Sequence, residues 1–253
     1  MSHVIIFDTE TTGNRDHPDR EVIESAWIAL HGGQVDPDGL SVFSLYRGDS
    51  SRRLYKPSKP CSFGSLAVHH ILPNDLQGCE PSSSFSLPVG VQYLIGHSVD
   101  FDWESIGKPD VKRICTHAMS KAIWPTADSH SQSALLYMLE GVNSETRDQL
   151  RNAHSALTDC HNNYTLLRHI LSAKPDITSW SALYSFSEHA RLPTHMPMGR
   201  NKGTPITQIE SGEMEWYLDR RVGDPYMWKA FEAELDRRRG AFLNEDWGDE
   251  ESV

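Results

Sequence analysis

The spacing of apolar residues changes along the chain, from short strand-like runs in the first third to helical spacing afterwards. Two β-branched runs, residues 3–7 and 21–30, flank a polar, turn-prone stretch, which predicts a hairpin. From residue 131 onward apolar residues recur mostly three or four apart, which predicts helices. The expected strands are residues 3–7, 21–30, 41–46, 53–56, 92–95 and 111–115. The expected helices are residues 65–70, a helix starting at 103–106, and residues 131–139, 157–171, 177–192, 213–221 and 224–239.

Strands first, followed by alternating helices and strands, predict an α/β fold with a mixed sheet. Pro175 marks a boundary, and residues 196–209, with Gly199, Gly203 and Pro205, predict a turn-rich hairpin ahead of two helices. We expect a main domain over residues 1–175, a linking helix within 176–194 and a small α+β C-terminal module over 195–243. The residues from 244 to 253 hold five acids and few apolar groups, which predicts a disordered acidic tail.

Composition permits one sizeable globular core, since 253 residues with 38% hydrophobic content can bury enough apolar surface. No apolar run approaches the roughly 18 residues of a membrane-spanning helix. The N-terminal MSHVIIFDTE lacks the features of a signal peptide, so we expect a cytoplasmic protein without a membrane partner. The four cysteines form no CxxC pair and are expected to be reduced.

The net charge of −11 argues at first against a nucleic-acid partner, which normally meets a basic surface. Carboxylates that hold divalent cations count as negative in this sum but are neutralised when the cations bind. Acidity alone therefore excludes little.

Asp8 and Glu10 lie two residues apart at the end of an apolar strand, so their side chains point to the same face. Two carboxylates this close disfavour each other's ionisation unless a cation lies between them. Oxygen ligands of this kind suit Mg²⁺ or Mn²⁺. By itself a D-x-E pattern is weak evidence, because many exposed strand ends carry one.

Two further segments strengthen the metal hypothesis: GHSVDFD at residues 96–102 and NAHSALTD at residues 152–159. Five helical steps leave His154 and Asp159 about 140° apart, so they cannot share one helix face. His154 is therefore expected in a loop just before the helix. Asp159 is expected in the first turn, where the helix dipole favours its charge.

With FDTETTG at residues 7–13, these segments resemble the DEDDh branch of the DnaQ-like 3′–5′ exonucleases, with the exodeoxyribonuclease X and ribonuclease T groups nearest. The segments AVHHI (67–71) and CTHAMSKAIWP (115–125) add to a resemblance that covers about residues 1–172. It implies a ribonuclease H-like mixed β-sheet flanked by helices. The residues after 194 resemble a short module that often follows such exonucleases.

The resemblance also implies a two-metal mechanism. Asp8, Glu10 and Asp159 would hold one Mg²⁺ or Mn²⁺, and Asp8 with Asp102 the second. His154 would act as the general base, and nucleoside 5′-monophosphates would be released. The candidates for substrate binding are Thr11, Thr12, His97, Phe101 and His69.

Other interpretations of these candidates stay open. His97 either orders the loop of the second motif or caps it. His69 either lines a nucleotide pocket or caps the C-terminus of its helix, and Phe101 is expected in the core. Ser98 stands where the family usually has Asn. The arginines of the C-terminal module, with nearby aromatic rings, either contact phosphates and bases or form a solvated helix face.

We expect a 3′–5′ exonuclease acting on single-stranded DNA or 3′ overhangs. No apolar wedge follows the first motif in NRDHPDR, so strong duplex unwinding is not expected. An exoribonuclease of the ribonuclease T kind is the alternative enzyme, with RNA as substrate. A binding protein with residual catalysis is the alternative of a different class. A homodimer stays open, since relatives can dimerise and the sequence shows no interface pattern.

Overall fold

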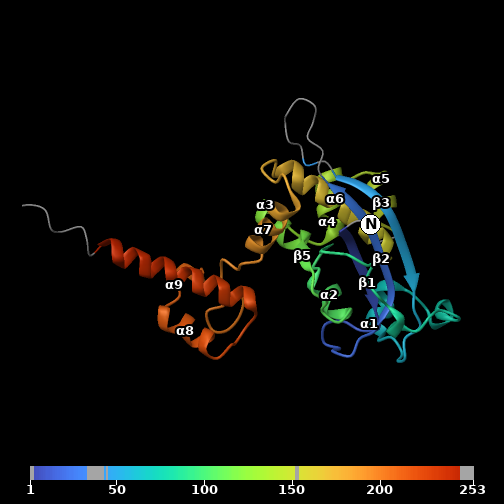
Figure 1. The fold of residues 1–253 in the computed structure, drawn as a ribbon, viewed down its shortest axis with the longest axis horizontal. Helices are drawn as coiled ribbons and strands as arrows, with labels where there is room; N and C mark the ends of the chain where they lie inside the picture. Colours follow the sequence, from blue (N-terminus) through green and yellow to red (C-terminus); the bar gives the residue numbers. More distant parts are fainter. Residues whose placement is uncertain (1–2, 33–42, 44, 152–153, 246–253) are drawn as a thin grey trace, which may run out of the picture. The chain divides into compact units, whose positions relative to one another are not determined.

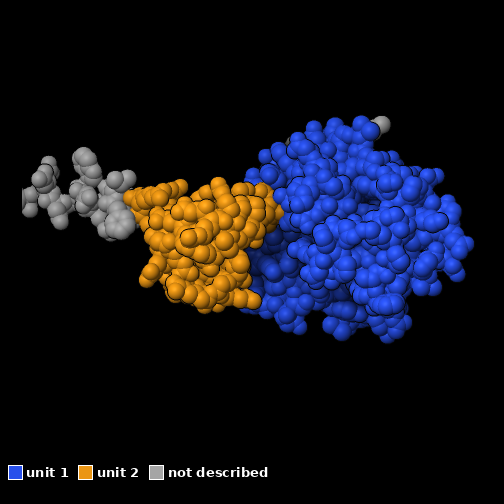
Figure 2. All heavy atoms as spheres, turned by 90° about the horizontal axis from the view of Figure 1, so that it is seen from below, with its two compact units in different colours: residues 1–187 blue, residues 188–253 orange. Residues whose placement is uncertain are grey.

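The computed structural model describes residues 3–32, 43, 45–151 and 154–245. The chain forms two compact units, residues 1–187 and residues 188–253 (Figure 2). The boundary falls within helix α7 (Trp180–Ala190). Each unit has its own buried core. The finer division into a domain, a linking helix and a module stays a prediction.

The first unit is built on a five-stranded mixed sheet with the order β3-β2-β1-β4-β5 (Figure 1). Strand β2 is antiparallel to both of its neighbours, whereas β1, β4 and β5 are parallel. The expected mixed sheet is therefore present. The strands are β1 (Val4–Thr11), β2 (Val22–Gly32), β3 (Leu45–Leu54), β4 (Tyr93–Gly96) and β5 (Lys112–Cys115).

Helices cover both faces of this sheet. The long helix α6 (Ala156–Ala173) packs against β1 and β2, and is itself packed by α3 and α4. On the other face Ile5 and Phe7 of β1 join Leu94 and Val99 in a core that Trp103 helps to cover. The remaining helices of this unit are α1 (Phe63–His69), η1 (Pro73–Leu76), η2 (Ser82–Ser84), α2 (Asp100–Ser105), α3 (Thr116–Ile123), α4 (Gln132–Glu140) and α5 (Ser144–Leu150).

Strand β1 extends beyond its parallel neighbour. Residues Val4 to Phe7 are fully buried, but β4 pairs only with Val4, Ile5 and Ile6. The last residues of β1 therefore have an open backbone edge on that side. The register with β2 shifts between Glu10 and Thr11, an irregularity of the kind that often re-aims side chains beside functional sites.

The third strand differs from its prediction. One strand, β3, replaces the two expected at 41–46 and 53–56, and residues 41, 42 and 44 of the first lie outside the described residues. Its centre, GDSSRR, is polar because β3 is an edge strand with most of its side chains exposed. An apolar pattern cannot reveal a strand that is held mainly by backbone pairing with β2.

One predicted helix start needs correction, and one helix was missed. The helix expected to start at 103–106 is α2, which starts at Asp100 and ends at Ser105. Helix α5 was not predicted, because SETRDQL is polar and is marked mainly by its capping residue Asn143, whose side chain accepts from Thr146 N–H.

The second unit is helical in its described part, so the predicted α+β character of the module is wrong. Residues 195–205 form a loop with one isolated bridge, between His195 and Pro205, in place of the hairpin expected over 196–209. Pro205 has no N–H to continue a ladder. The helices are η3 (Ile206–Gln208), α8 (Ser211–Asp219) and α9 (Pro225–Glu245). Of the predicted acidic tail, residues 246–253 lie outside the described residues, while 244 and 245 end α9.

The core of this unit contains Met196, Ile206, Met214, Tyr217 and Phe231, with four further buried apolar residues. Gly199 has φ +76°, and a Cβ there would lie 2.2 Å from the Tyr217 hydroxyl, so the loop requires glycine. Among the described helices of both units, none combines the length and apolar character that a membrane span requires.

Candidate active site

Three segments that are distant in sequence bring carboxylates to one place in the first unit. Asp8 and Glu10 come from β1, Asp102 from α2 and Asp159 from the first turn of α6. Their proximity is evident from their electrostatics, because Glu10, Asp102 and Asp159 each raise the pKa of Asp8. The four predicted carboxylates are therefore neighbours.

Asp102 is fixed by Thr9 at the open edge of β1. Its Oδ1 accepts two hydrogen bonds from Thr9, one from the backbone N–H at 2.9 Å and one from the hydroxyl at 2.7 Å. Asp102 is only 3% exposed. Because β4 ends before this point, an acid from α2 takes the position that a ladder partner would occupy.

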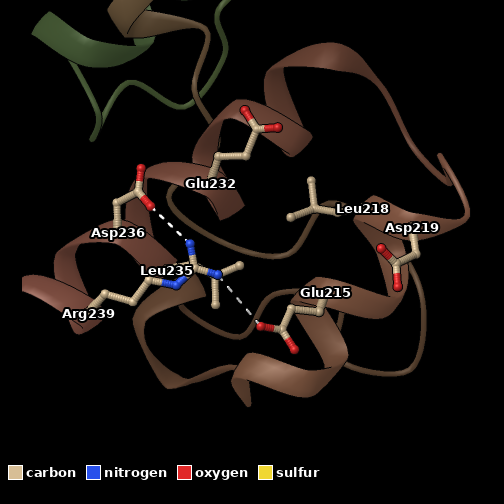
Figure 3. Close-up of a pocket in the computed structure, with 7 residues that line it drawn as sticks. All are labelled: Glu215, Leu218, Asp219, Glu232, Leu235, Asp236 and Arg239. Atoms are coloured by element: carbon tan, nitrogen blue, oxygen red, sulfur yellow. Dashed lines mark hydrogen bonds and ion pairs between the residues drawn. The ribbon is translucent and has the colours of Figure 1, made fainter. Parts of the chain in front are cut away.

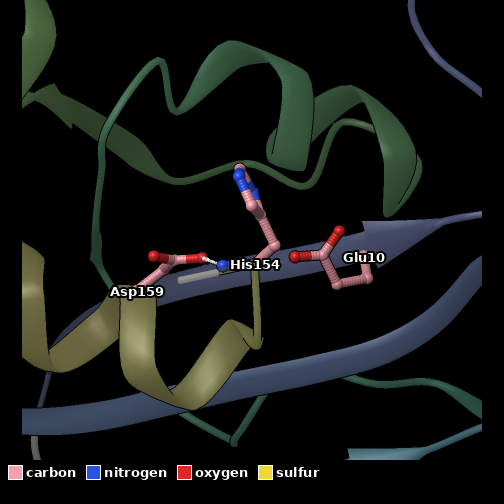
Figure 4. Close-up of side chains that lie close together, drawn as sticks. All are labelled: Glu10, His154 and Asp159. Carbon is pink, nitrogen blue, oxygen red and sulfur yellow. Dashed lines mark hydrogen bonds between the residues drawn. The ribbon is translucent and has the colours of Figure 1, made fainter. Parts of the chain in front are cut away.

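Glu10, His154 and Asp159 form a compact group. One potential ligand atom from each lies within 4.8 Å of the other two. His154 lies just ahead of α6, as its spacing predicted, and Asp159 lies in the first turn. Figure 4 shows the two carboxylates on either side of His154, whose backbone N–H donates to Asp159 Oδ2 at 2.9 Å.

Glu24 is a fifth carboxylate at this site and was not among the predicted site residues. It lies on β2 directly opposite Glu10, is fully buried, and forms an ion pair with Arg52 of β3. The available signal was an acid within the apolar run VIESAWIAL, since a fully buried Glu is rare without a partner.

The electrostatics of the cluster favour a cation. Burial raises the pKa of Asp8 well above its usual value, and the four neighbouring carboxylates raise it further. Burial, Asp159 and Glu24 raise the pKa of Glu10 to about 9. Burial raises the pKa of Asp102 to about 7, although the hydrogen bonds from Thr9 oppose the change. Burial likewise raises the pKa of Asp159.

Mutual repulsion of this kind is relieved when a divalent cation binds between the carboxylates. The donors are hard oxygens with one imidazole, a set that suits Mg²⁺ or Mn²⁺. The residues present therefore fit the divalent metal that the motifs imply.

The hydroxyls of the two threonines proposed for substrate binding make hydrogen bonds to backbone groups of the turn after β1. The Thr11 hydroxyl donates to Gly13 O at 2.7 Å, and the Thr12 hydroxyl accepts from Glu21 N–H at 2.9 Å. Both residues are buried. Their hydroxyls thus shape the turn next to the carboxylates.

The other proposed contacts are also held by the protein. His97 Nε2 donates to His130 O at 2.8 Å, and burial lowers the pKa of this ring to about 4. His69 Nδ1 accepts from Ile71 N–H just after α1, while its Nε2 is buried and finds no partner among the described residues. Phe101 is half-buried, with the Arg20 guanidinium 4.6 Å above its ring.

The arginine run 237–239 of the second unit is paired with acids of the same unit, whereas Arg220 and Arg221 lie over the rings of Trp216 and Trp228. Arg237 and Arg238 both bond Glu234. Arg239 pairs with Asp236 and Glu215 beside a hollow of about 500 Å³ between α8 and α9 (Figure 3). Four acids and two leucines complete its lining, namely Glu215, Asp219, Glu232, Asp236, Leu218 and Leu235. This acidic lining disfavours phosphate and supports the helix-face interpretation of the arginine run.

Comparison with known proteins gives a fold but no sequence match. Neither the scan against protein-family models nor the search of curated proteins finds a match. A solved structure of Exonuclease X in complex with 5′-overhanging duplex DNA superposes with a TM-score of 0.53 at 21% identity. The alignment covers 73% of this chain and 99% of that chain. The chain has the fold of Exonuclease X. The expected ribonuclease H-like fold is therefore confirmed.

Two further nucleases resemble the chain more distantly than Exonuclease X does. The zinc-bound E. coli ExoI–ssDNA complex gives a TM-score of 0.48 at 17% identity, covering 68% of this chain and 41% of that chain. A 3′-exonuclease solved for its recognition of histone mRNA stem-loop gives 0.47 at 14% identity, covering 68% and 82%.

Proposed function

We propose that the protein is a divalent-metal-dependent 3′–5′ exonuclease. The observation that carries this proposal is the grouping of Glu10, His154 and Asp159 within 4.8 Å, with Asp8 and Asp102 beside them. The fold shared with Exonuclease X supports it. The three motifs that resemble the DEDDh exonucleases supply the chemistry.

In this proposal Asp8, Glu10 and Asp159 hold one cation, and Asp8 with Asp102 holds the second. The cations, when bound, stabilise charge on the attacking and departing oxygens of the phosphodiester. His154 removes a proton from the attacking water, a role for which an imidazole is suited near neutral pH. The new bond joins the water oxygen to phosphorus and the P–O3′ bond breaks. Solvent returns a proton to the departing 3′ oxygen, and a nucleoside 5′-monophosphate leaves.

We infer single-stranded DNA or a 3′ overhang as the preferred substrate, with RNA as the alternative. Support comes from the sequence after the first motif, where NRDHPDR offers no apolar wedge to open a duplex. A duplex with a 5′ overhang belongs among the test substrates, because Exonuclease X is solved in complex with one.

The test is a denaturing-gel time course on 5′-labelled DNA and RNA of matched sequence, in single-stranded and duplex forms. The reactions contain Mg²⁺, Mn²⁺ or chelator, and Asp159→Ala is the inactive control. We expect a chelator-sensitive ladder that shortens from the 3′ end and is absent in the variant. Intact substrate in every metal lane would contradict the exonuclease.

A binding protein with residual catalysis is the second candidate, and Asp8→Ala separates the two. An enzyme loses hydrolysis in this variant but still binds nucleic acid. A binding protein keeps its function in an assay that does not depend on hydrolysis. The five acids gathered at one point favour the enzyme, because a surface that only binds phosphates gains nothing from them.

A further inference from the structure

Glu24 occupies an unusual position for an acid that is not a predicted metal ligand. It lies near the start of β2, an inner strand of the sheet, and is fully buried. In the antiparallel ladder it is the direct partner of Glu10, so both side chains lie on the face that α6 covers. Two acids opposite one another destabilise a sheet unless other contacts compensate.

Both oxygens of Glu24 have partners. Oε1 forms the ion pair with Arg52 Nε, and Oε2 lies 3.4 Å from the backbone N–H of Ala156. Both oxygens are thus directed at protein donors, one on β3 and one at the start of α6. The role argued for Glu24 therefore runs through these two contacts.

The contact with Ala156 reaches the start of α6. The N-cap of this helix, Ser155, makes no side-chain capping bond. The N–H of Ala156 in the first turn instead donates to Oε2 of Glu24. A negative group at a helix N-terminus is also favoured by the helix dipole. Asp159 follows Ala156 by three residues, which is nearly one turn.

We propose that Glu24 is a positioning residue, which fixes the strand that carries Glu10 to the helix that carries Asp159, with Arg52 as its counter-ion. The inference rests on the proposed metal-dependent function. Glu10 and Asp159 come from different elements, and the distance between their side chains determines whether one cation can bind both. A residue that fixes these two elements to each other therefore affects cation binding. Groups behind metal ligands commonly set affinity in this way.

The experiment measures Mn²⁺ binding to the full-length protein by titration calorimetry, at temperatures below the melting point of each variant. The variants are Glu24→Ala, the double variant Glu24→Gln/Arg52→Ala, and Arg53→Ala as control. Arg53 is an exposed neighbour of Arg52 on the same strand. In the double variant the single amide oxygen faces Ala156 N–H without competition from Arg52.

We expect Glu24→Ala to weaken Mn²⁺ binding about 10-fold or more. The double variant should recover most of this loss, and Arg53→Ala should bind like the wild type. A purely structural role predicts a lower melting temperature with unchanged Mn²⁺ affinity, which would overturn the inference. Equal loss in Glu24→Ala and the double variant would also overturn it, because the acceptor for Ala156 would then be irrelevant.

The proposed function can fail separately. If the wild type binds no Mn²⁺ and produces no ladder of shortened products, the proposed exonuclease function is wrong. If the wild type binds Mn²⁺, Asp159→Ala does not, and Glu24→Ala binds like the wild type, only the role of Glu24 is wrong.

Discussion

The backbone N–H of His154 donates a 2.9 Å hydrogen bond to Oδ2 of Asp159, and His154 has the left-handed backbone angle φ +68°. A residue with a Cβ adopts this angle at a cost, which the bond to Asp159 helps to offset. Since the donor is the backbone, replacing the imidazole leaves the bond available. The chemical role of the ring can therefore be tested without moving Asp159.

His154→Ala should lower kcat by about 100-fold or more, the range typical of a lost general base. Mn²⁺ binding should be unchanged, because the three aspartates and Glu10 remain. Steady-state kinetics and calorimetry on the same preparation measure both quantities. A parallel loss of Mn²⁺ binding would make His154 a ligand, which the 4.8 Å grouping also permits.

Thr9→Val should weaken Mn²⁺ binding about 10-fold, because Asp102 loses the hydroxyl that donates to it at 2.7 Å. Valine keeps the size of the side chain and the backbone N–H bond. Thr9→Ser restores a hydroxyl and should restore affinity. Equal binding in all three proteins would show that the N–H of Thr9 is sufficient to hold Asp102.

The site was more predictable from sequence than the sheet around it. Asp8 and Glu10 share a face because strands alternate, and the five-residue spacing of His154 and Asp159 places one before a helix and one within it. Glu24 was not predicted as a site residue because its position in the site depends on strand register. The register brings it opposite Glu10 and near the start of α6. Register is a tertiary property that no local pattern in VIESAWIAL reveals.

The cation-free protein should lose thermal stability as pH rises through neutrality. The folded-state pKa values of Asp102 and Glu10, about 7 and about 9, exceed the ordinary values of 3.8 and 4.5. The folded state therefore keeps protons that the unfolded chain has released, and this stabilisation is lost as pH rises toward those values. We expect the melting temperature to fall by more than about 3 °C between pH 6 and pH 9.

Scanning fluorimetry with and without Mn²⁺ measures this pH dependence. Saturating Mn²⁺ should flatten the curve, because a bound cation favours the ionised carboxylates. In the absence of metal, Glu10→Gln should reduce the fall of the melting temperature with pH. A fall of equal size in Glu10→Gln would assign the pH dependence to groups other than Glu10.

Ser98→Gly should raise the free energy of unfolding by about 1 kcal/mol, since Ser98 has φ +69° and glycine adopts that angle without a steric penalty. Ser98→Ala is the control and should bring no gain, because alanine keeps the Cβ. Urea unfolding of the metal-free protein measures the difference. A loss of stability in Ser98→Gly would show that the serine side chain contributes more than its backbone angle costs.

The C-terminal module shows where sequence patterns fail for a different reason. Gly199, Gly203 and Pro205 correctly indicated turns, but turns alone do not create strands. The loop instead packs Met196 and Ile206 onto α8 and α9, so burial of side chains outweighed any tendency to pair. The arginine run at 237–239 likewise became interpretable only once its acidic partners were visible.

The order of the site residues along the chain determines when the site is completed during synthesis. Asp8 and Glu10 emerge from the ribosome early, whereas His154 and Asp159 arrive only with α6, near the end of the first unit. A nascent chain, or a fragment truncated before residue 154, lacks two of the three grouped residues, His154 and Asp159. If the cluster is the nuclease centre, incomplete products are inert toward nucleic acid, and hydrolysis begins only after the sheet has received its covering helix.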